Sequence, residues 1–271
     1  MKRLLLFLIV PALVAAFTLT SDTTYSKGPP AKVLPEYLAL GDSLGVGIGA
    51  SDPATTGYVP LFRDFLESKK GLDKKGTELF LNNLSIGGAT SSSLISQQLS
   101  AAVAELEDRN GDKNKKNDVE VVTVDIGGND VLALLGICAG GVTPTCTAAI
   151  STTFATFSAN FDFILDELRT AAGPDTTMIV MTYYNSFVAT GCPLNALAPL
   201  GDIVLEGEPL LGLPVGLNDI IRAIAATHDA EVADTFGKLP PDDLVGGFDC
   251  LHPVDSGYAE IAEQFIEAFN G

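Results

Sequence analysis

Short apolar runs along the chain alternate with longer segments in which apolar residues recur every three or four positions. The short runs are typical of buried strands, and the longer segments are typical of amphipathic helices. Five strands that are each followed by a helix predict a three-layer α/β/α fold, with one five-stranded parallel sheet between helices. The predicted strands are Tyr37–Leu40, Leu79–Leu84, Val119–Ile126, Thr177–Thr182 and Glu231–Asp234, and the predicted helices are Tyr58–Ser68, Ser92–Leu106, Phe154–Ala172, Leu217–Thr227 and Ser256–Phe269.

The first residues depart from this alternation. Lys2 and Arg3 precede an apolar run that extends to Phe17, passes through small residues near Ala16 and is short for a bilayer span. This order is typical of a secretory signal peptide, and an uncleaved membrane anchor is the alternative. We expect a signal peptide over 1–16, a flexible lead-in over 17–34 and one folded domain over 35–271, with no membrane span left after cleavage.

Charge and histidine content narrow the possible functions. The chain of 271 residues has 34 Asp and Glu against 16 Lys and Arg, a formal net charge of −18. Such a charge repels phosphate backbones, so we expect no nucleic-acid partner. Because the chain has only two histidines, a metal centre built from three histidines is excluded, and a histidine base must be His228 or His252.

The four cysteines are even in number and form no C-x-x-C pair. In an exported protein this pattern favours two disulfides over zinc binding or redox chemistry, and four free thiols are the alternative. Of the three possible pairings we favour Cys138–Cys146, which are close in sequence, together with Cys192–Cys250.

Unusual loops follow the predicted strands. In a parallel sheet covered by helices, ligands bind at the carboxyl ends of the strands, so we expect the functional site where these loops meet. The loops read Gly41-Asp42-Ser43-Leu44-Gly45 after the first strand, Ser85-Ile86-Gly87-Gly88-Ala89-Thr90 after the second, Gly127-Gly128-Asn129-Asp130 after the third, and Asp249-Cys250-Leu251-His252-Pro253 before the last helix.

Ser43 is the candidate nucleophile of these loops. A serine needs a general base that is oriented by a third group. His252 lies on a Pro-containing loop with Asp249 three positions upstream, where a carboxylate can hold the imidazole Nδ1–H and stabilise the imidazolium. His228 lies at the end of a predicted helix and is explained as a helix-end residue. We therefore predict His252 as the base.

Attack by a serine on an acyl group also needs hydrogen-bond donors for the oxyanion that forms. The predicted donors are the backbone N–H groups of Ser43 and Gly88 and the side-chain amide of Asn129. Gly88 can also be explained as a turn glycine with positive φ, and Asn129 as a helix N-cap.

The four loops, taken in order, resemble the signature blocks of the SGNH, or GDSL, hydrolase family, and the match extends from about residue 36 to the C-terminus. The resemblance implies a flavodoxin-like sheet of order 2-1-3-4-5 and hydrolysis of carboxylic esters or thioesters without a metal or cofactor. It also implies the roles predicted above for Ser43, His252, Asp249, Gly88 and Asn129.

Two other motifs overlap the first loop. Gly41-x-Ser43-x-Gly45 fits the nucleophile elbow of α/β-hydrolases, but that fold places several strands before the elbow. Gly45-x-Gly47-x-x-Ala50 fits a dinucleotide fingerprint, but Pro53 interrupts the helix that the motif requires. We reject both readings.

The sequence thus predicts a secreted, monomeric serine esterase that cleaves a small-molecule or lipid ester. The leucine-rich segment 192–216 follows the fourth strand, and it forms either a wall for an acyl chain or a packed surface insertion. A carbohydrate acetylesterase on the same fold and a non-catalytic extracellular binding module are the alternatives. A disulfide at Cys250 would also restrain the loop that carries Asp249 and His252.

Overall fold

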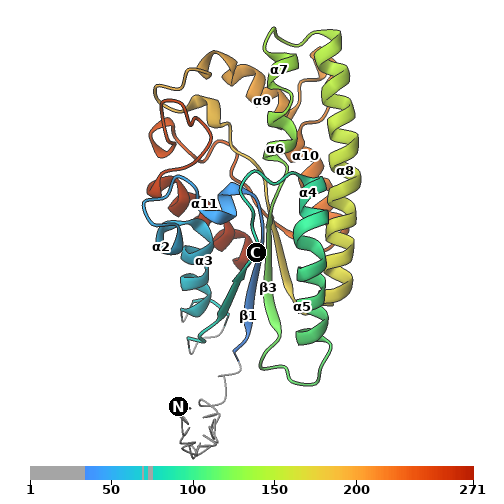
Figure 1. The fold of residues 1–271 in the computed structure, drawn as a ribbon, viewed down its shortest axis with the longest axis vertical. Coiled ribbons are helices and arrows are strands. Elements are labelled where there is room, and N and C mark those ends of the chain that lie inside the picture. The colour runs from blue at the N-terminus through green and yellow to red at the C-terminus, as the bar shows by residue number, and fades with distance from the viewer. Residues whose placement is uncertain (1–33, 69, 73–75) are drawn as a thin grey trace, which may run out of the picture. The chain divides into compact units, whose positions relative to one another are not determined.

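Parallel strands form the centre of the computed structural model, which describes residues 34–68, 70–72 and 76–271 (Figure 1). In these residues five strands pair in the order β2-β1-β3-β4-β5, so the predicted sheet is confirmed. The predicted signal peptide and all of the predicted lead-in except Leu34 lie outside the described residues. The strands are β1 (Glu36–Gly41), β2 (Phe80–Asn83), β3 (Val119–Asp125), β4 (Thr177–Met181) and β5 (Glu231–Ala233).

Burial explains the composition of the strands. All six residues of β1 are buried, and six of the seven residues of β3 are buried, as expected for central strands with helices on both faces. The strand β2 lies at the edge of the sheet, and its first residue, Phe80, is half exposed.

Helices cover both faces of the sheet, and α6, α7 and α9 lie beyond the carboxyl ends of the strands (Figure 1). The helices α3 and α11 pack together on one face, where Tyr58 and Phe265 stack with their ring centroids 4.7 Å apart, and α5, α8 and α10 cover the other. The helices are α1 (Ser43–Val46), α2 (Pro53–Thr56), α3 (Tyr58–Glu67), α4 (Ser91–Leu94), α5 (Ser100–Asn110), α6 (Gly128–Leu132), α7 (Leu135–Cys138), α8 (Pro144–Ala172), α9 (Ala198–Glu206), α10 (Leu217–Thr227) and α11 (Asp255–Asn270). Within the described ranges, no helix combines the length and the hydropathy of a membrane span.

The helix predicted to begin at Phe154 begins ten residues earlier, at Pro144. The Thr143 side chain accepts a hydrogen bond from the backbone N–H of Cys146, and Pro144 occupies the first helical position, where its missing N–H costs nothing. The added turns are rich in threonine and alanine, so they lack the apolar period on which the prediction relied.

The segment predicted as one helix from Ser92 to Leu106 contains a π-helical turn, Ile95–Leu99, between α4 and α5. Such turns are frequent at functional sites. Gln98 lies in this turn and is buried, and its side-chain amide bonds both the N–H and the C=O of Gly41, at 3.0 and 2.8 Å. The π turn therefore places Gln98 against the end of β1, two residues before Ser43.

Candidate active site

Ser43 is the first residue of α1, and only Asp42 separates it from the end of β1. Asp42 caps this short helix, because its carboxylate accepts a hydrogen bond from the N–H of Leu44 at 2.9 Å. The turn ends at Gly47, which is in the left-handed conformation with φ 84°. Ser43 is thus held at the carboxyl edge of the sheet, the position expected for it.

The structure brings Ser43, His252 and Asp249 together. His252 Nε2 lies 2.8 Å from Ser43 Oγ, and His252 Nδ1 lies 2.9 and 3.0 Å from the two carboxylate oxygens of Asp249. Partial burial opposes the ionisation of Asp249, but its hydrogen bonds with His252 outweigh burial and hold the pKa of this carboxyl below its usual value. Asp249 is therefore a carboxylate at neutral pH.

The loop that carries His252 is restrained by several contacts. Asp249 Oδ1 accepts hydrogen bonds from the N–H groups of Leu251 and His252, which closes a turn between the acid and the imidazole. Cys250, between them, has φ 52°, a conformation that is unfavourable for a residue other than glycine. The Cys192–Cys250 disulfide and a 2.7 Å hydrogen bond from Tyr184 Oη to the carbonyl of Leu251 hold the loop in place.

The two predicted oxyanion donors outside the first loop line the same cavity as Ser43. Gly88 has φ 77°, and a side chain there would meet no other atom within 4 Å, so its backbone is open to a ligand. Asn129 is not a helix N-cap, because Gly127 caps α6. Its amide donates hydrogen bonds to the carbonyl of Ala89 at 2.9 Å and to the carboxylate of Asp42 at 3.3 Å.

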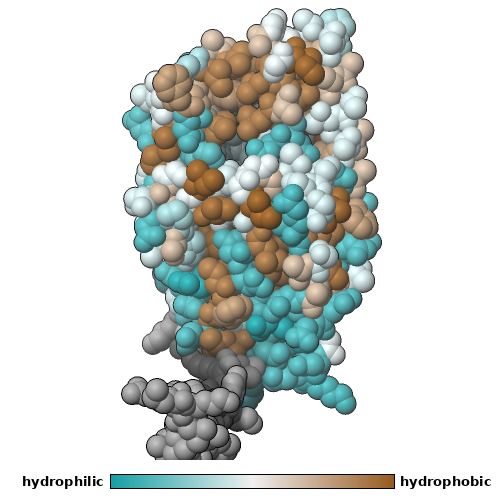
Figure 2. All heavy atoms as spheres, viewed as in Figure 1, coloured by the Kyte–Doolittle hydropathy of each residue, from teal (hydrophilic) through white to brown (hydrophobic). Residues whose placement is uncertain are grey.

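A mainly apolar cavity of about 240 Å³ opens at Ser43 and His252. Leu200, Val204 and Leu205 of the predicted wall segment line it, whereas Leu210 of the same segment is exposed and lies outside it. The segment is therefore partly a wall and partly a surface insertion. Figure 2 shows hydrophobic residues gathered at the end of the molecule that carries α6, α7 and α9.

The opposite wall of the cavity was not predicted from the sequence. It comes from α6, α7 and the residues that join them, and its members are aliphatic side chains that begin two positions after Asn129: Val131, Leu132, Leu134 and Leu135. The uninterrupted apolar character of this run was a signal that it is not a solvent-exposed loop.

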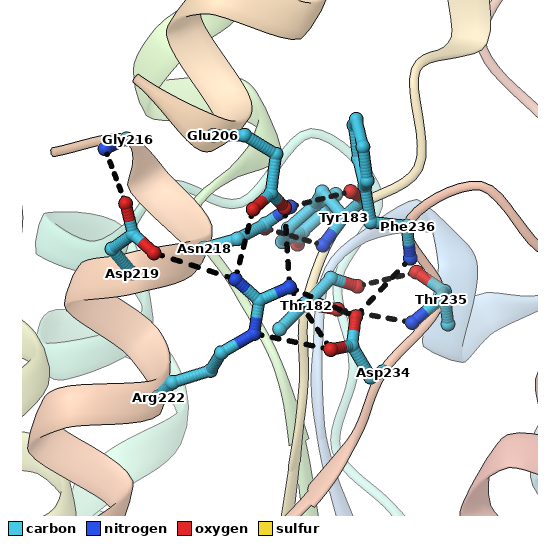
Figure 3. A network of polar contacts seen from close by, with 10 residues as sticks. All are labelled: Thr182, Tyr183, Glu206, Gly216, Asn218, Asp219, Arg222, Asp234, Thr235 and Phe236. Carbon is cyan, nitrogen blue, oxygen red and sulfur yellow. Dashed lines mark hydrogen bonds and ion pairs between the residues drawn. The ribbon is translucent and has the colours of Figure 1, made fainter. Parts of the chain in front are cut away.

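One arginine ties the α9 wall to the sheet (Figure 3). Arg222 of α10 pairs with Glu206 at the end of α9 at 3.0 Å and with Asp234, just after β5, at 2.9 Å. Asn218 bonds Glu206 at 2.7 Å and both backbone groups of Tyr183, two residues after β4. These contacts fix the distance between the wall and the carboxyl edge of the sheet.

The remaining candidate residues lie outside this arrangement. His228 ends α10, and its Nε2 lies 2.8 Å from Asp162 of α8, as expected for a helix-end residue. The Cys138–Cys146 disulfide joins α7 to the start of α8, so both disulfides are present with the favoured pairing. No cluster of three metal-ligating side chains occurs in the part of the chain that the structure describes.

Comparisons with known proteins give a family and a fold. A model of the GDSL-like lipase/acylhydrolase family matches residues 39–260. Comparison with curated protein sequences finds no match.

Three solved structures resemble the fold, and all three share less than a quarter of their residues with this chain. A lipase from a goat rumen metagenome is 19% identical, with a TM-score of 0.59 over 86% of this chain and 97% of its own. An extracellular lipase from Streptomyces rimosus is 20% identical, with a TM-score of 0.58 over 86% and 99%. An acetylxylan esterase from Geobacillus stearothermophilus is 17% identical, with a TM-score of 0.56 over 89% and 97%.

Proposed function

The chain belongs to the GDSL-like lipase/acylhydrolase family and is a carboxylic ester hydrolase, and we propose that it works through a triad of Ser43, His252 and Asp249. The observation that carries this proposal is the chain of short contacts from Ser43 Oγ through both ring nitrogens of His252 to Asp249, at the mouth of a cavity. A serine hydroxyl is a weak nucleophile on its own, and these contacts supply the oriented general base that activates it.

In the proposed reaction Ser43 Oγ attacks the acyl carbonyl carbon while His252 Nε2 takes the hydroxyl proton. The N–H groups of Ser43 and Gly88 and the amide of Asn129 donate to the oxyanion. Asn129 does so by exchanging its 3.3 Å hydrogen bond to Asp42, the longer of its two, for one to the oxyanion. His252 then gives the proton to the leaving alcohol, and water repeats the two steps to release the acid and restore Ser43.

We propose an ester with an apolar acyl chain as the substrate. The cavity beside Ser43 is lined by aliphatic side chains from α6, α7 and α9, which offer burial to an acyl chain and few partners to a sugar. An acetyl group would leave most of the cavity empty, which disfavours a carbohydrate acetylesterase. The basic and apolar N-terminus together with two disulfides supports export of a protein that works outside the cytoplasm.

The triad is tested by hydrolysis of p-nitrophenyl butyrate and by covalent labelling with a fluorophosphonate probe. Ser43→Ala should abolish both, and His252→Gln should lower kcat on the order of 10³-fold or more. His228→Gln is the matched control, since it makes the same change in the other histidine, and it should keep full turnover. Labelling of the Ser43→Ala protein, or equal losses in the two histidine variants, would refute the assignment.

A further inference from the structure

A fully buried carboxyl group, Asp125, lies directly beneath the turn that carries Ser43. It is the last residue of β3, and it takes no part in the proposed chemistry. Its Oδ2 accepts hydrogen bonds from the N–H groups of Asp42 at 3.1 Å and Gly45 at 3.2 Å, and its Oδ1 accepts one from Tyr58 Oη at 2.5 Å. One carboxyl group therefore holds the backbone on both sides of Ser43.

The two glycines on either side of Ser43, Gly41 and Gly45, leave room for this carboxyl group because they have no side chain. A Cβ at Gly41 would lie 2.1 Å from Asp125 Oδ1, and a Cβ at Gly45 would lie 2.2 Å from Ser85 Oγ and 2.7 Å from Asp125 Oδ1. Neither glycine has a positive φ, so close approach and not backbone conformation requires them. The Gly41-x-Ser43-x-Gly45 pattern thus leaves space for the side chains of Asp125 and Ser85, which explains the glycines without a nucleophile elbow.

A second buried carboxyl group belongs to Asp42, whose backbone N–H is one of the two donors to Asp125 Oδ2. It bonds the N–H of Leu44, the amide of Asn129 and, at 2.9 Å, the hydroxyl of Tyr183. No lysine or arginine among the described residues forms an ion pair with either carboxyl.

The charged and titratable groups that face this pair are one imidazole and several phenols. Burial and the negative charge of Asp42 raise the pKa of Asp125 well above its usual value, and burial also raises the pKa of Asp42, which the charge of His252 opposes. Two adjacent buried carboxyls that lack a cationic partner repel each other when both are charged, which disfavours ionisation of both. The facing groups are His252 and the hydroxyls of Tyr37, Tyr58, Tyr183, Tyr184 and Tyr258.

We propose that Asp125 is the positioning residue of the nucleophile turn and that it acts as a neutral acid, sharing one proton with Asp42. In this state it can accept from the two backbone N–H groups while its own proton lies between the carboxyls. Asp42 carries the remaining negative charge on the side of His252, where it favours the imidazolium that forms during attack. This inference rests on the proposed role of Ser43.

Two substitutions separate the neutral acid from a charged or a merely space-filling group. Asp125→Asn keeps the shape, the acceptor oxygen and a donor toward Asp42, so it should retain kcat on p-nitrophenyl butyrate within about threefold at pH 7. Asp125→Ala leaves the turn unsupported, and it should lower kcat about 10²-fold with KM changed by less than about threefold, since a displacement near 1 Å has this effect. Glu120→Gln makes the same chemical change at the other end of β3 and should leave kcat unchanged.

The pH dependence of kcat distinguishes a shared proton from a purely structural role, because a purely structural role would not change it. Wild-type kcat should fall at alkaline pH, when the pair loses its shared proton, and the Asp125→Asn protein should lack this fall. If Asp125→Asn is as inactive as Asp125→Ala, or if both proteins lose activity in the same alkaline range, the neutral-acid assignment is wrong.

Thermal denaturation tests the proton without using activity. Because the folded state keeps a proton that the unfolded chain releases above about pH 4, wild-type stability must fall as pH rises toward the raised pKa. The Tm of Asp125→Asn minus that of wild type should therefore grow from about pH 5 to pH 9. A constant difference would overturn the inference. Failure of wild type to hydrolyse esters would overturn the proposed function instead, and the Tm difference would still decide whether Asp125 holds a proton.

Discussion

Substitution of Val204 by phenylalanine should shorten the acyl chain that the enzyme prefers. Val204 is a buried residue of α9 whose side chain lines the cavity next to Leu200 and Leu205. The phenylalanine side chain has about four more carbon atoms than valine, and these carbons would occupy part of the cavity. The substitution leaves Ser43 and His252 untouched.

The size of the cavity sets the expected chain length. An apolar cavity of about 150 Å³ holds a benzene ring, or about 25 Å³ for each carbon atom. At that ratio 240 Å³ holds about ten atoms, which matches the eight carbons and two carboxyl oxygens of an octanoyl ester. The four carbons that phenylalanine adds should reduce the optimum to about butyrate.

The free energy of burial sets the expected difference in rate. Each buried methylene contributes about 0.8 kcal/mol, so the four that distinguish octanoate from butyrate contribute about 3 kcal/mol. Wild type should therefore hydrolyse the octanoyl ester with a kcat/KM on the order of 10²-fold above that of the butyryl ester. Val204→Phe should remove this gain.

The assay is the kcat/KM of p-nitrophenyl esters with acyl chains from acetate to dodecanoate, each kept below its aggregation limit. Leu210→Phe is the matched control, because Leu210 belongs to the same segment but is 93% exposed and lies outside the cavity. The dependence of its kcat/KM on acyl-chain length should be the same as that of wild type. A wild-type preference for acetate over octanoate, or a Val204→Phe profile identical to wild type, would refute the acyl-chain assignment.

Three further predictions concern the supports of the site and the sheet. Replacement of Cys192 and Cys250 by alanine should lower the free energy of unfolding in urea by about 4 kcal/mol, the chain-entropy value for a loop of 58 residues. It should also lower kcat, and an unchanged kcat would show that the disulfide does not support catalysis. Arg222→Met should reduce kcat/KM for the octanoyl ester more than for the butyryl ester, because α9 loses its ion pairs to the sheet, and Arg222→Lys should recover part of the loss. Equal effects on both esters would show that Arg222 does not position the cavity wall. Burial raises the pKa of Glu36 to about 7, against the opposing charge of Arg109, so the proton on Glu36 stabilises the fold below about pH 4.5 and this stabilisation is lost as pH rises through 7. Glu36→Gln should therefore remove up to about 3 kcal/mol from the change in the free energy of unfolding over this pH range. An unchanged slope of stability against pH would disprove this role.

Much of the fold followed from the chain because apolar periodicity reports burial. The predicted strands lie within two residues of β1 to β5 at each end, and their parallel arrangement follows from the alternation with helices. The helices α6, α7 and α9 escaped prediction because their apolar residues face a cavity at the end of the sheet, where neither a strand period nor a long helical period applies. The early start of α8 depended on a single cap at Thr143, a local signal with little apolar pattern around it.

The sequence by itself determined where the residues of the site lie along the chain, because glycine-rich loops with Ser43 and Asn129 follow apolar strands and a Pro-containing loop with His252 precedes the last helix. Tertiary structure alone decided which buried groups support them. Asp125 is the polar end of an apolar strand, and Gln98 is one of several polar residues in a helical segment, so neither differs in sequence from an ordinary boundary or surface residue. Their contacts join residues 57 and 83 positions apart, and only the packing of α4, the π turn and β3 against β1 brings those backbone groups within hydrogen-bond distance.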